Sequence, residues 1–237
     1  LAFGFLYWTG KPLTLDEQEY LLLAHNIAAG RGFVYNSPVT GVVEGRHVGR
    51  APAYPVFLAA IGRLVPGSAI TAPQMPRSTP AEVKVAQAVV GAATIWIIAL
   101  IAGRLAGPRA AVAAAALAAV YPPLVWIGSY VLSETLYTAL ALVGVWLLDR
   151  AVGGDTSRPV LTSLASGALG GLATLARPAM LVYLALAGVW LAWRRRPAYL
   201  AGLTLGAALV VLPWTVRNYV ETGRVVLVAS EGGVTFW

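Results

Sequence analysis

The sequence predicts an all-α fold: a polytopic bundle of transmembrane helices whose long first extracytoplasmic loop carries interfacial helices. Of the 237 residues, 58% are hydrophobic and only 11% are charged, whereas a soluble domain has about 25% charged residues. Several apolar runs reach the roughly 18–20 residues that cross the core of a bilayer. The sequence contains no cysteine, so it offers no disulfide or thiolate metal site. A net charge of +7 fits arginines that anchor inner loops better than it fits a nucleic-acid partner.

The first part of the chain predicts the end of one span and a helix on the membrane surface. The apolar run 1–8 is too short to span, so we expect it to be the outer end of a first helix. In the outer loop, 9–80, Thr14 and Glu17 match the capping box that opens a helix. Apolar residues then recur at helical spacing (Tyr20, Leu23, Ala24 and Ile27). This pattern predicts a juxtamembrane helix with one apolar face.

The remainder of the outer loop predicts a second short helix and then irregular chain. The apolar segment 54–65 is too short to span with ease and carries Arg63, so we expect an interfacial or re-entrant helix. Residues 66–80 contain four prolines, which favours a loop.

Six spans are expected after this loop. They are predicted at about 82–103, 110–127, 131–148, 159–176, 178–193 and 197–213. Short joints make consecutive spans antiparallel neighbours. An outer segment, 214–237, follows, and we treat 1–237 as a single transmembrane domain.

The distribution of arginine predicts the orientation. Alternate short joints carry seven basic residues (Arg104, Arg109, Arg150, Arg158, Arg194, Arg195 and Arg196), and the opposite short joints carry Arg177 alone. Cytoplasmic loops are enriched in arginine and lysine. The chain is therefore expected to lie in the plasma (inner) membrane, with the loop 9–80 outside. Eight of the ten acidic residues then lie outside (Asp16, Glu17, Glu19, Glu44, Glu82, Glu134, Glu221 and Glu231), so any chemistry faces outward.

Carboxylates at the outer membrane boundary are the first candidates for chemistry. Asp16, Glu17 and Glu19 form a dense acidic run, and Glu134 opens a span. A carboxylate beside apolar surroundings has a shifted pKa and can accept a proton. The alternative is that acids favour the first turn of a helix because they complement its dipole. Helix propensity and the helix dipole do not decide between a catalytic role and a purely structural role for these acids.

Three outward arginines are the second candidates. Arg50, Arg177 and Arg217 either reach toward lipid headgroups or bind phosphate through their guanidinium forks. Carboxylates and arginines on one outer face fit a lipid-phosphate donor and an acceptor with a hydroxyl or amine. Glu44 and His47 are weak candidates for a divalent metal site, although a surface histidine is the favoured interpretation. The sequence has no GxSxG, Walker or HExxH motif, which excludes the enzyme classes that these define.

The order of five segments resembles the N-terminal part of the GT-C membrane glycosyltransferases. The segments are LDEQEYLLLAHNIAAGRGF, GRAPAYPVFLA, SYVLSETLY, LARPAMLVY and PWTVRNYVETGRVVLVASEGGVTFW. They are most similar to the branch of protein O-mannosyltransferases and the lipid A aminoarabinose transferase. Since members of that branch continue through further spans, the resemblance implies that 1–237 is the N-terminal portion of a longer architecture.

The resemblance also implies roles for individual residues. Asp16 matches a catalytic base, with Glu17 beside it as in the Asp-Glu pair of the mannosyltransferases. Arg50 matches a basic residue that contacts the donor phosphate, although Arg-Ala-Pro stands here in place of Lys-Pro-Pro. Arg177 and Arg217 match basic positions that face the donor. Glu134 resembles an acid of the second outer loop.

The implied function is inverting transfer of a monosaccharide from a polyprenyl-phosphate donor to a lipid, protein or polysaccharide acceptor. Glu134, Glu17 or Glu44 would orient the acceptor or help to hold a divalent metal. The alternative is a transporter or flippase for lipid-linked sugars, or a non-catalytic membrane scaffold. The mid-span stretches 86–102, 111–121 and 136–148 contain no charged residue, which favours surface chemistry over translocation.

Overall fold

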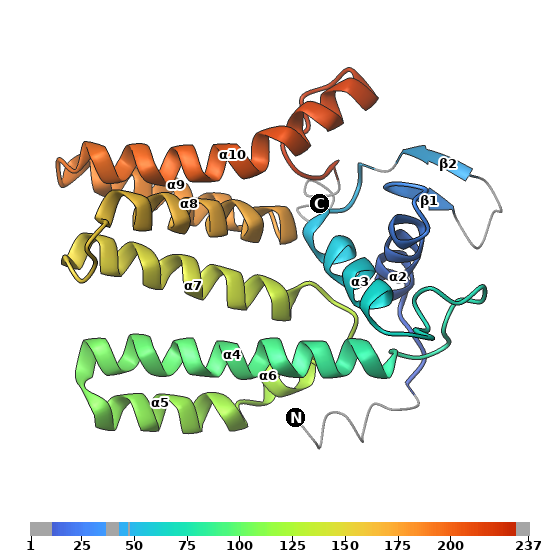
Figure 1. The fold of residues 1–237 in the computed structure, drawn as a ribbon, viewed down its shortest axis with the longest axis horizontal. Helices are drawn as coiled ribbons and strands as arrows, with labels where there is room; N and C mark the ends of the chain where they lie inside the picture. Colours follow the sequence, from blue (N-terminus) through green and yellow to red (C-terminus); the bar gives the residue numbers. More distant parts are fainter. Residues whose placement is uncertain (1–10, 37–42, 47, 231–237) are drawn as a thin grey trace, which may run out of the picture. The chain divides into compact units, whose positions relative to one another are not determined.

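Residues 11–36, 43–46 and 48–230 are described by a computed structural model (Figure 1). Helices make up most of the described chain, so the predicted all-α class is confirmed. The chain divides into two compact units. Unit 1 comprises residues 1–47 and 52–136, and unit 2 comprises residues 48–51 and 137–237.

Two short helices build the outer part of unit 1. Helix α2 spans Leu15–Ala28 and helix α3 spans Ala53–Leu64, close to the positions predicted from the sequence. The predicted capping box is confirmed, because Thr14 and Glu17 each accept a hydrogen bond from the other's backbone N–H. The buried face of α2 packs against α3, where the rings of Tyr20 and Tyr54 meet edge to face with centroids 5.0 Å apart.

A short hairpin was not predicted. Strands β1 (Val34–Asn36) and β2 (Val43–Arg46) pair in antiparallel fashion. The side-chain amide of Asn26 on α2 donates to the carbonyl oxygen of Val34 over 2.7 Å. This tertiary contact attaches β1 to α2, and strands of three and four residues are too short to show a clear alternation in sequence.

The predicted loop 66–80 is confirmed as irregular chain, and it is held at several points. His25 Nδ1 lies 2.9 Å from the carbonyl oxygen of Ile70. The carboxylate of Glu82 accepts from the Ser68 hydroxyl at 2.7 Å and from the backbone N–H of Ala69 at 2.8 Å. An isolated bridge joins Pro12 and Ser78. These contacts attach the loop to α2, to the start of α4 and to the segment before α2.

Three further helices complete unit 1. Helix α4 (Ala81–Ala106) lies beside α5 (Pro108–Val120), and α6 (Pro122–Ile127) follows (Figure 1). The predicted span 110–127 is therefore divided in two. Tyr121 has an extended backbone, because a proline follows it and disfavours the helical conformation for the preceding residue.

Unit 2 contains the remaining helices. They are α7 (Glu134–Gly153, whose first residues belong to unit 1), α8 (Pro159–Ala176), α9 (Met180–Trp193) and α10 (Pro197–Thr222). Within the described residues, α4, α7, α8 and α10 are long and apolar enough to cross a membrane, whereas α5 and α9 are shorter. A membrane protein is therefore supported, and the six-span topology stays a prediction.

Helix α10 continues beyond its predicted end at residue 213. Pro213 lies inside the helix, and Figure 1 shows α10 bending in its second half. A proline removes one backbone hydrogen bond and commonly bends a helix without ending it. The helix ends at Thr222 and is followed by Gly223, which has a left-handed backbone (φ 67°), so Arg217 lies on a helix rather than past one.

Close approach of α8 and α10 forms the main packing of unit 2. Gly167 on α8 and Gly206 on α10 lie directly against the backbone of the facing helix, at Leu203 and Leu164 respectively. Small residues let helix backbones approach closely in membranes, where packing rather than hydrophobic burial drives association. Ser166 adds a hydrogen bond of 2.7 Å to the carbonyl oxygen of Gly144 on α7.

Gly206→Ala is expected to destabilise unit 2. A Cβ atom at this position would overlap the carbonyl oxygen of Leu164, which is backbone and cannot rotate away. Overpacking costs about 1–3 kcal/mol or more, so the midpoint of thermal unfolding in detergent should fall by several degrees. The matched control is Gly188→Ala on α9, where the nearest atom would be an ordinary 3.5 Å away. Equal midpoints for the two variants would contradict the packing described here.

Candidate functional site

The first turn of α2 carries two adjacent carboxylates in opposite environments. Asp16 is exposed, whereas the side chain of Glu17 is 0% exposed. Successive residues on a helix point about 100° apart, so one neighbour can face the interior while the other faces outward. Both were predicted from the sequence as site residues, but the fold buries Glu17 and leaves Asp16 exposed.

Glu17 is held by four donors from three residues of unit 1. Its Oε2 atom accepts from Lys11 Nζ at 2.6 Å, from Thr14 N at 2.8 Å and from Thr14 Oγ1 at 2.9 Å. Its Oε1 atom accepts from the backbone N–H of Val131 at 2.9 Å. Burial alone would raise the pKa of Glu17, but the Lys11 ammonium and the N–H and O–H donors outweigh it and lower the pKa. The carboxylate is therefore ionised, and both of its oxygens accept hydrogen bonds from these partners.

The chain between α6 and α7 is fixed by side chains that sequence reasoning missed. Gln87 Nε2 on α4 donates to the carbonyl oxygens of Gly128 (3.2 Å) and Tyr130 (2.7 Å). Gln87 Oε1 accepts from the Tyr54 hydroxyl at 3.0 Å, and Lys11 Nζ lies 4.1 Å from the centre of the Tyr130 ring. The sequence contained one indication of these contacts. Gln87 is an amide residue in an otherwise apolar span, and buried polar groups in membranes need hydrogen-bond partners.

Glu134 begins α7 directly after this fixed chain. Its Oε2 atom is buried. Burial raises the pKa of the Tyr54 phenol well above its ordinary value, and Tyr20, Glu134 and Glu17 add to the effect. Tyr54 therefore keeps its proton and acts as a hydrogen-bond donor. Two predicted site residues, Glu17 and Glu134, therefore both act electrostatically on the Tyr54 hydroxyl.

The three predicted phosphate-binding arginines belong to unit 2. Arg177 directly follows α8, where its backbone N–H donates to Ala173 O. Arg217 lies on α10, with its guanidinium 4.7 Å from the centre of the Trp214 ring and Nη1 3.0 Å from Asn218 Oδ1. Arg50 lies in the short segment 48–51.

Hydrogen bonds connect the segment that carries Arg50 with the helix that carries Arg217, both within unit 2. The N–H of Ser230 donates to Val48 O over 2.9 Å. The chain leading to Ser230 is in turn held on α10, because Trp214 Nε1 donates to Val228 O at 2.7 Å and the buried Asn218 donates to Val226 O at 3.0 Å. The segment 48–51 is thus joined to the chain that follows α10, and that chain is joined to α10 itself.

The weak metal candidates lie at the edge of the described chain. Glu44 is on β2, but its side chain, like the whole of His47, lies outside the described residues. Among the side chains that are described, no three His, Cys, Asp or Glu residues are grouped closely enough to share a metal ion. The Glu44–His47 metal site stays a prediction.

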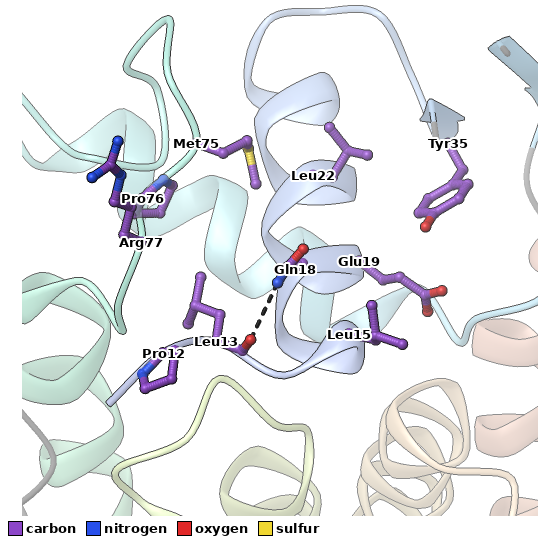
Figure 2. A pocket seen from close by; sticks show the side chains of 10 residues that line it. All are labelled: Pro12, Leu13, Leu15, Gln18, Glu19, Leu22, Tyr35, Met75, Pro76 and Arg77. Atoms are coloured by element: carbon purple, nitrogen blue, oxygen red, sulfur yellow. Dashed lines mark hydrogen bonds between the residues drawn. The ribbon is translucent and has the colours of Figure 1, made fainter. Parts of the chain in front are cut away.

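A cavity of about 320 Å³ lies beside α2 in unit 1 (Figure 2). Its lining comes from the segment before α2, from α2, from β1 and from the loop 66–80 (Pro12, Leu13, Leu15, Gln18, Glu19, Leu22, Tyr35, Met75, Pro76 and Arg77). Gln18 Nε2 donates to Leu13 O over 3.1 Å, as the dashed line in Figure 2 shows. The cavity is therefore on the same helix as Asp16.

Comparison with known proteins gives one family. The model described as dolichyl-phosphate-mannose-protein mannosyltransferase matches residues 77–216, from the end of the outer loop through most of α10. No curated protein and no solved structure matches the chain. The matched range includes Glu134 and Arg177. Asp16, Glu17 and Arg50 precede it, and Arg217 follows it by one residue.

Proposed function

Because the chain belongs to the dolichyl-phosphate-mannose-protein mannosyltransferase family, a family of membrane glycosyltransferases, we propose that it transfers a monosaccharide from a polyprenyl-phosphate donor. The acceptor presents its hydroxyl on the extracytoplasmic face of the plasma membrane. The observation that carries the proposal is the pair of carboxylates at the start of α2. One is buried and committed to partners, and the other is exposed on the same rigid turn.

Asp16 is the general base in this proposal. Its backbone is held by the capping box of α2, and Glu17 binds this turn to Lys11 and to Val131. A base must be positioned before it can contribute, because proton transfer needs hydrogen-bond geometry. Glu17 therefore supports catalysis as a positioning residue, and its own carboxylate stays with its four donors.

The proposed step is a single inverting displacement. The Asp16 carboxylate takes the proton of the acceptor hydroxyl while the acceptor oxygen forms a bond to the anomeric carbon of the sugar. The bond between that carbon and the phosphate oxygen breaks, and its electron pair leaves with the polyprenyl phosphate. Negative charge thus develops on the leaving phosphate, where fixed cations lower the barrier.

Arg50, Arg177 and Arg217 supply that positive charge in the proposal. The hydrogen bonds from Ser230 to Val48 and from Trp214 to Val228 support a shared role for Arg50 and Arg217. The Trp214 ring, whose centre is 4.7 Å from the Arg217 guanidinium, helps to orient this group, and guanidinium groups suit bidentate binding of phosphate oxygens. Glu134 and Glu44 are proposed to orient the acceptor.

A labelled donor tests this function. Full-length protein in liposomes is given a polyprenyl-phosphate sugar labelled in both the sugar and the lipid, together with a membrane extract as the source of acceptor. We expect sugar transfer with release of an equal amount of free polyprenyl phosphate. Movement of intact donor across the bilayer without release would instead indicate a flippase, and the proposal would be wrong.

Arg50→Ala is expected to weaken donor binding. Losing a charge-assisted hydrogen bond costs about 1.5–3 kcal/mol, so the donor KM should rise roughly tenfold to a hundredfold. The control is Arg31→Ala, an exposed arginine of the same outer loop. A donor KM for the Arg50 variant equal to that of the control would remove Arg50 from the phosphate site.

A further inference from the structure

Residues 224–230, which we call the strap, turn back along the second half of α10 (Figure 1). Two side chains of the helix each hold the strap by one hydrogen bond. Trp214 Nε1 donates to Val228 O over 2.7 Å, and Thr215 Oγ1 donates to Leu227 O over 2.9 Å. The strap is therefore fixed against α10 within unit 2.

The amide of Asn218 joins this strap to an arginine of the same helix. Its Nδ2 atom donates to Val226 O at 3.0 Å and to Val228 O at 3.2 Å. Its Oδ1 atom accepts from Arg217 Nη1 at 3.0 Å. Asn218 is 0% exposed, so its amide depends on these protein partners rather than on bulk water. The position of the Arg217 guanidinium is thus linked to that of the strap.

The partners of Asn218 permit only one orientation of its amide. A carbonyl oxygen can only accept a hydrogen bond, and a guanidinium can only donate one. A flipped amide would place Oδ1 against two carbonyl oxygens and Nδ2 against the guanidinium of Arg217, and each of these contacts would then be repulsive. The two strap carbonyls therefore direct Oδ1 toward Arg217.

An amide at this position orients the guanidinium without cancelling its charge. A carboxylate in its place would form an ion pair with Arg217 and compete with a phosphate for the same cation. The Trp214 ring, whose centre lies 4.7 Å from the guanidinium, likewise attracts a cation without carrying a net charge. Asn218 and Trp214 therefore help to fix the guanidinium while adding no negative charge to it.

We propose that Asn218 is a positioning residue for donor binding, which holds the Arg217 guanidinium in place for the phosphate of the polyprenyl-phosphate donor. The inference rests on the proposed function, in which Arg217 contacts that phosphate, and it adds a residue that acts through Arg217. A guanidinium held in advance loses less conformational entropy when the phosphate binds. The strap also donates from Ser230 N to Val48 O over 2.9 Å, so the segment that carries Arg50 is attached to the same frame.

Two substitutions of Asn218 test this role in full-length protein in nanodiscs with the labelled donor. Asn218→Ala removes the contact that holds the guanidinium, so the donor KM should rise roughly tenfold, the scale of one hydrogen bond to a charged group. Asn218→Asp has nearly the same size and should raise the donor KM as well, because its carboxylate pairs with Arg217. The control is Thr215→Val, which removes one strap hydrogen bond without a contact to Arg217 and should leave the donor KM unchanged.

A double-mutant cycle separates positioning from a purely structural role. Arg217→Ala should raise the donor KM at least as much as Asn218→Ala does. The double variant should have the donor KM of Arg217→Ala alone, because no guanidinium is left to position. All variants are assayed below the lowest unfolding midpoint of the set, so that each is folded. Independent losses that multiply in the double variant would show that Asn218 only holds the strap, and a wild-type donor KM in both Asn218 variants would also overturn the inference.

Binding measured without transfer distinguishes this inference from the proposed function. Fluorescence anisotropy of a labelled polyprenyl phosphate reports its Kd directly, and the variants should show the same pattern in Kd as in donor KM. Sugar transfer by the wild type with equal donor KM in all variants would overturn the positioning role and leave the proposed function. Binding that Asn218→Ala weakens only when Arg217 is present, without any cleavage of the donor, would overturn the proposed function and leave the positioning role.

Discussion

Asp16→Asn is expected to lower kcat for sugar transfer by a factor of about 10²–10⁴, the usual contribution of a general base. Asparagine has nearly the same size as aspartate but cannot accept the proton of the acceptor. Because Asp16 is exposed, the substitution should leave the fold intact, and the midpoint of thermal unfolding should match that of the wild type. The measurement is single-turnover transfer from a labelled donor, with donor KM as a second readout that should change little.

A matched substitution makes this result specific. Asp155→Asn changes the same residue type in the joint between α7 and α8, on the predicted cytoplasmic side, and should transfer sugar at the wild-type rate. Wild-type turnover in the Asp16 variant would remove the proposed base. A loss of activity that comes with a lower unfolding midpoint would indicate a structural role instead.

Glu17→Gln should strongly destabilise unit 1. The substitution leaves the Lys11 ammonium without its ion-pair partner at a position where the lysine side chain is only 13% exposed. Removing one partner from a buried ion pair costs about 3–5 kcal/mol, and we expect about 2–3 kcal/mol here because Lys11 keeps some contact with water. Thermal unfolding in detergent should show a midpoint lower by several degrees, with transfer activity reduced in parallel.

A double-mutant cycle separates the ion pair from other effects. Lys11→Met alone should be milder than Glu17→Gln, because Glu17 retains Thr14 and Val131 as donors. The double variant should recover part of the loss, since replacing both partners leaves no buried charge alone. Strictly additive losses would show that Lys11 and Glu17 do not stabilise one another.

The pH dependence of stability gives an independent test of Glu17. Its pKa is lower in the folded protein than in the unfolded chain, so the folded state binds this proton less readily. The stabilisation is fully present above the ordinary glutamate pKa of about 4.3 and is lost as the pH falls through the lowered folded value. Below about pH 4, the wild type should therefore lose stability more steeply than the Glu17→Gln variant. Parallel curves would contradict the assignment.

Local patterns predicted the start of α2 well. The capping box needs only Thr14 and Glu17, three residues apart, so its signal is complete within one turn of helix. The break between α5 and α6 also has a local cause, the prolines after Tyr121. The continuous apolar content of 110–127 is typical of a single span, although the prolines divide it.

The difference between Asp16 and Glu17 could not be predicted in this way. Glu17 is buried and accepts from the backbone N–H of Val131, 114 residues away, and Lys11 lies against the Tyr130 ring. The same applies to the cavity, whose walls come from α2, β1 and the loop 66–80. Contacts between residues far apart in sequence leave no periodic signal.

Composition, helical spacing and arginine placement alone determined that this protein is a helical membrane protein with carboxylates and arginines at its predicted outer level. These properties follow from hydrophobic content and from the periodicity of single helices, which each segment carries by itself. Only the tertiary structure decided that Glu17 is buried among its donors, that Asp16 is exposed on the same helical turn, and that Gly167 and Gly206 bring α8 and α10 into contact. Burial and hydrogen bonding depend on which segments meet, and that is a property of the folded chain.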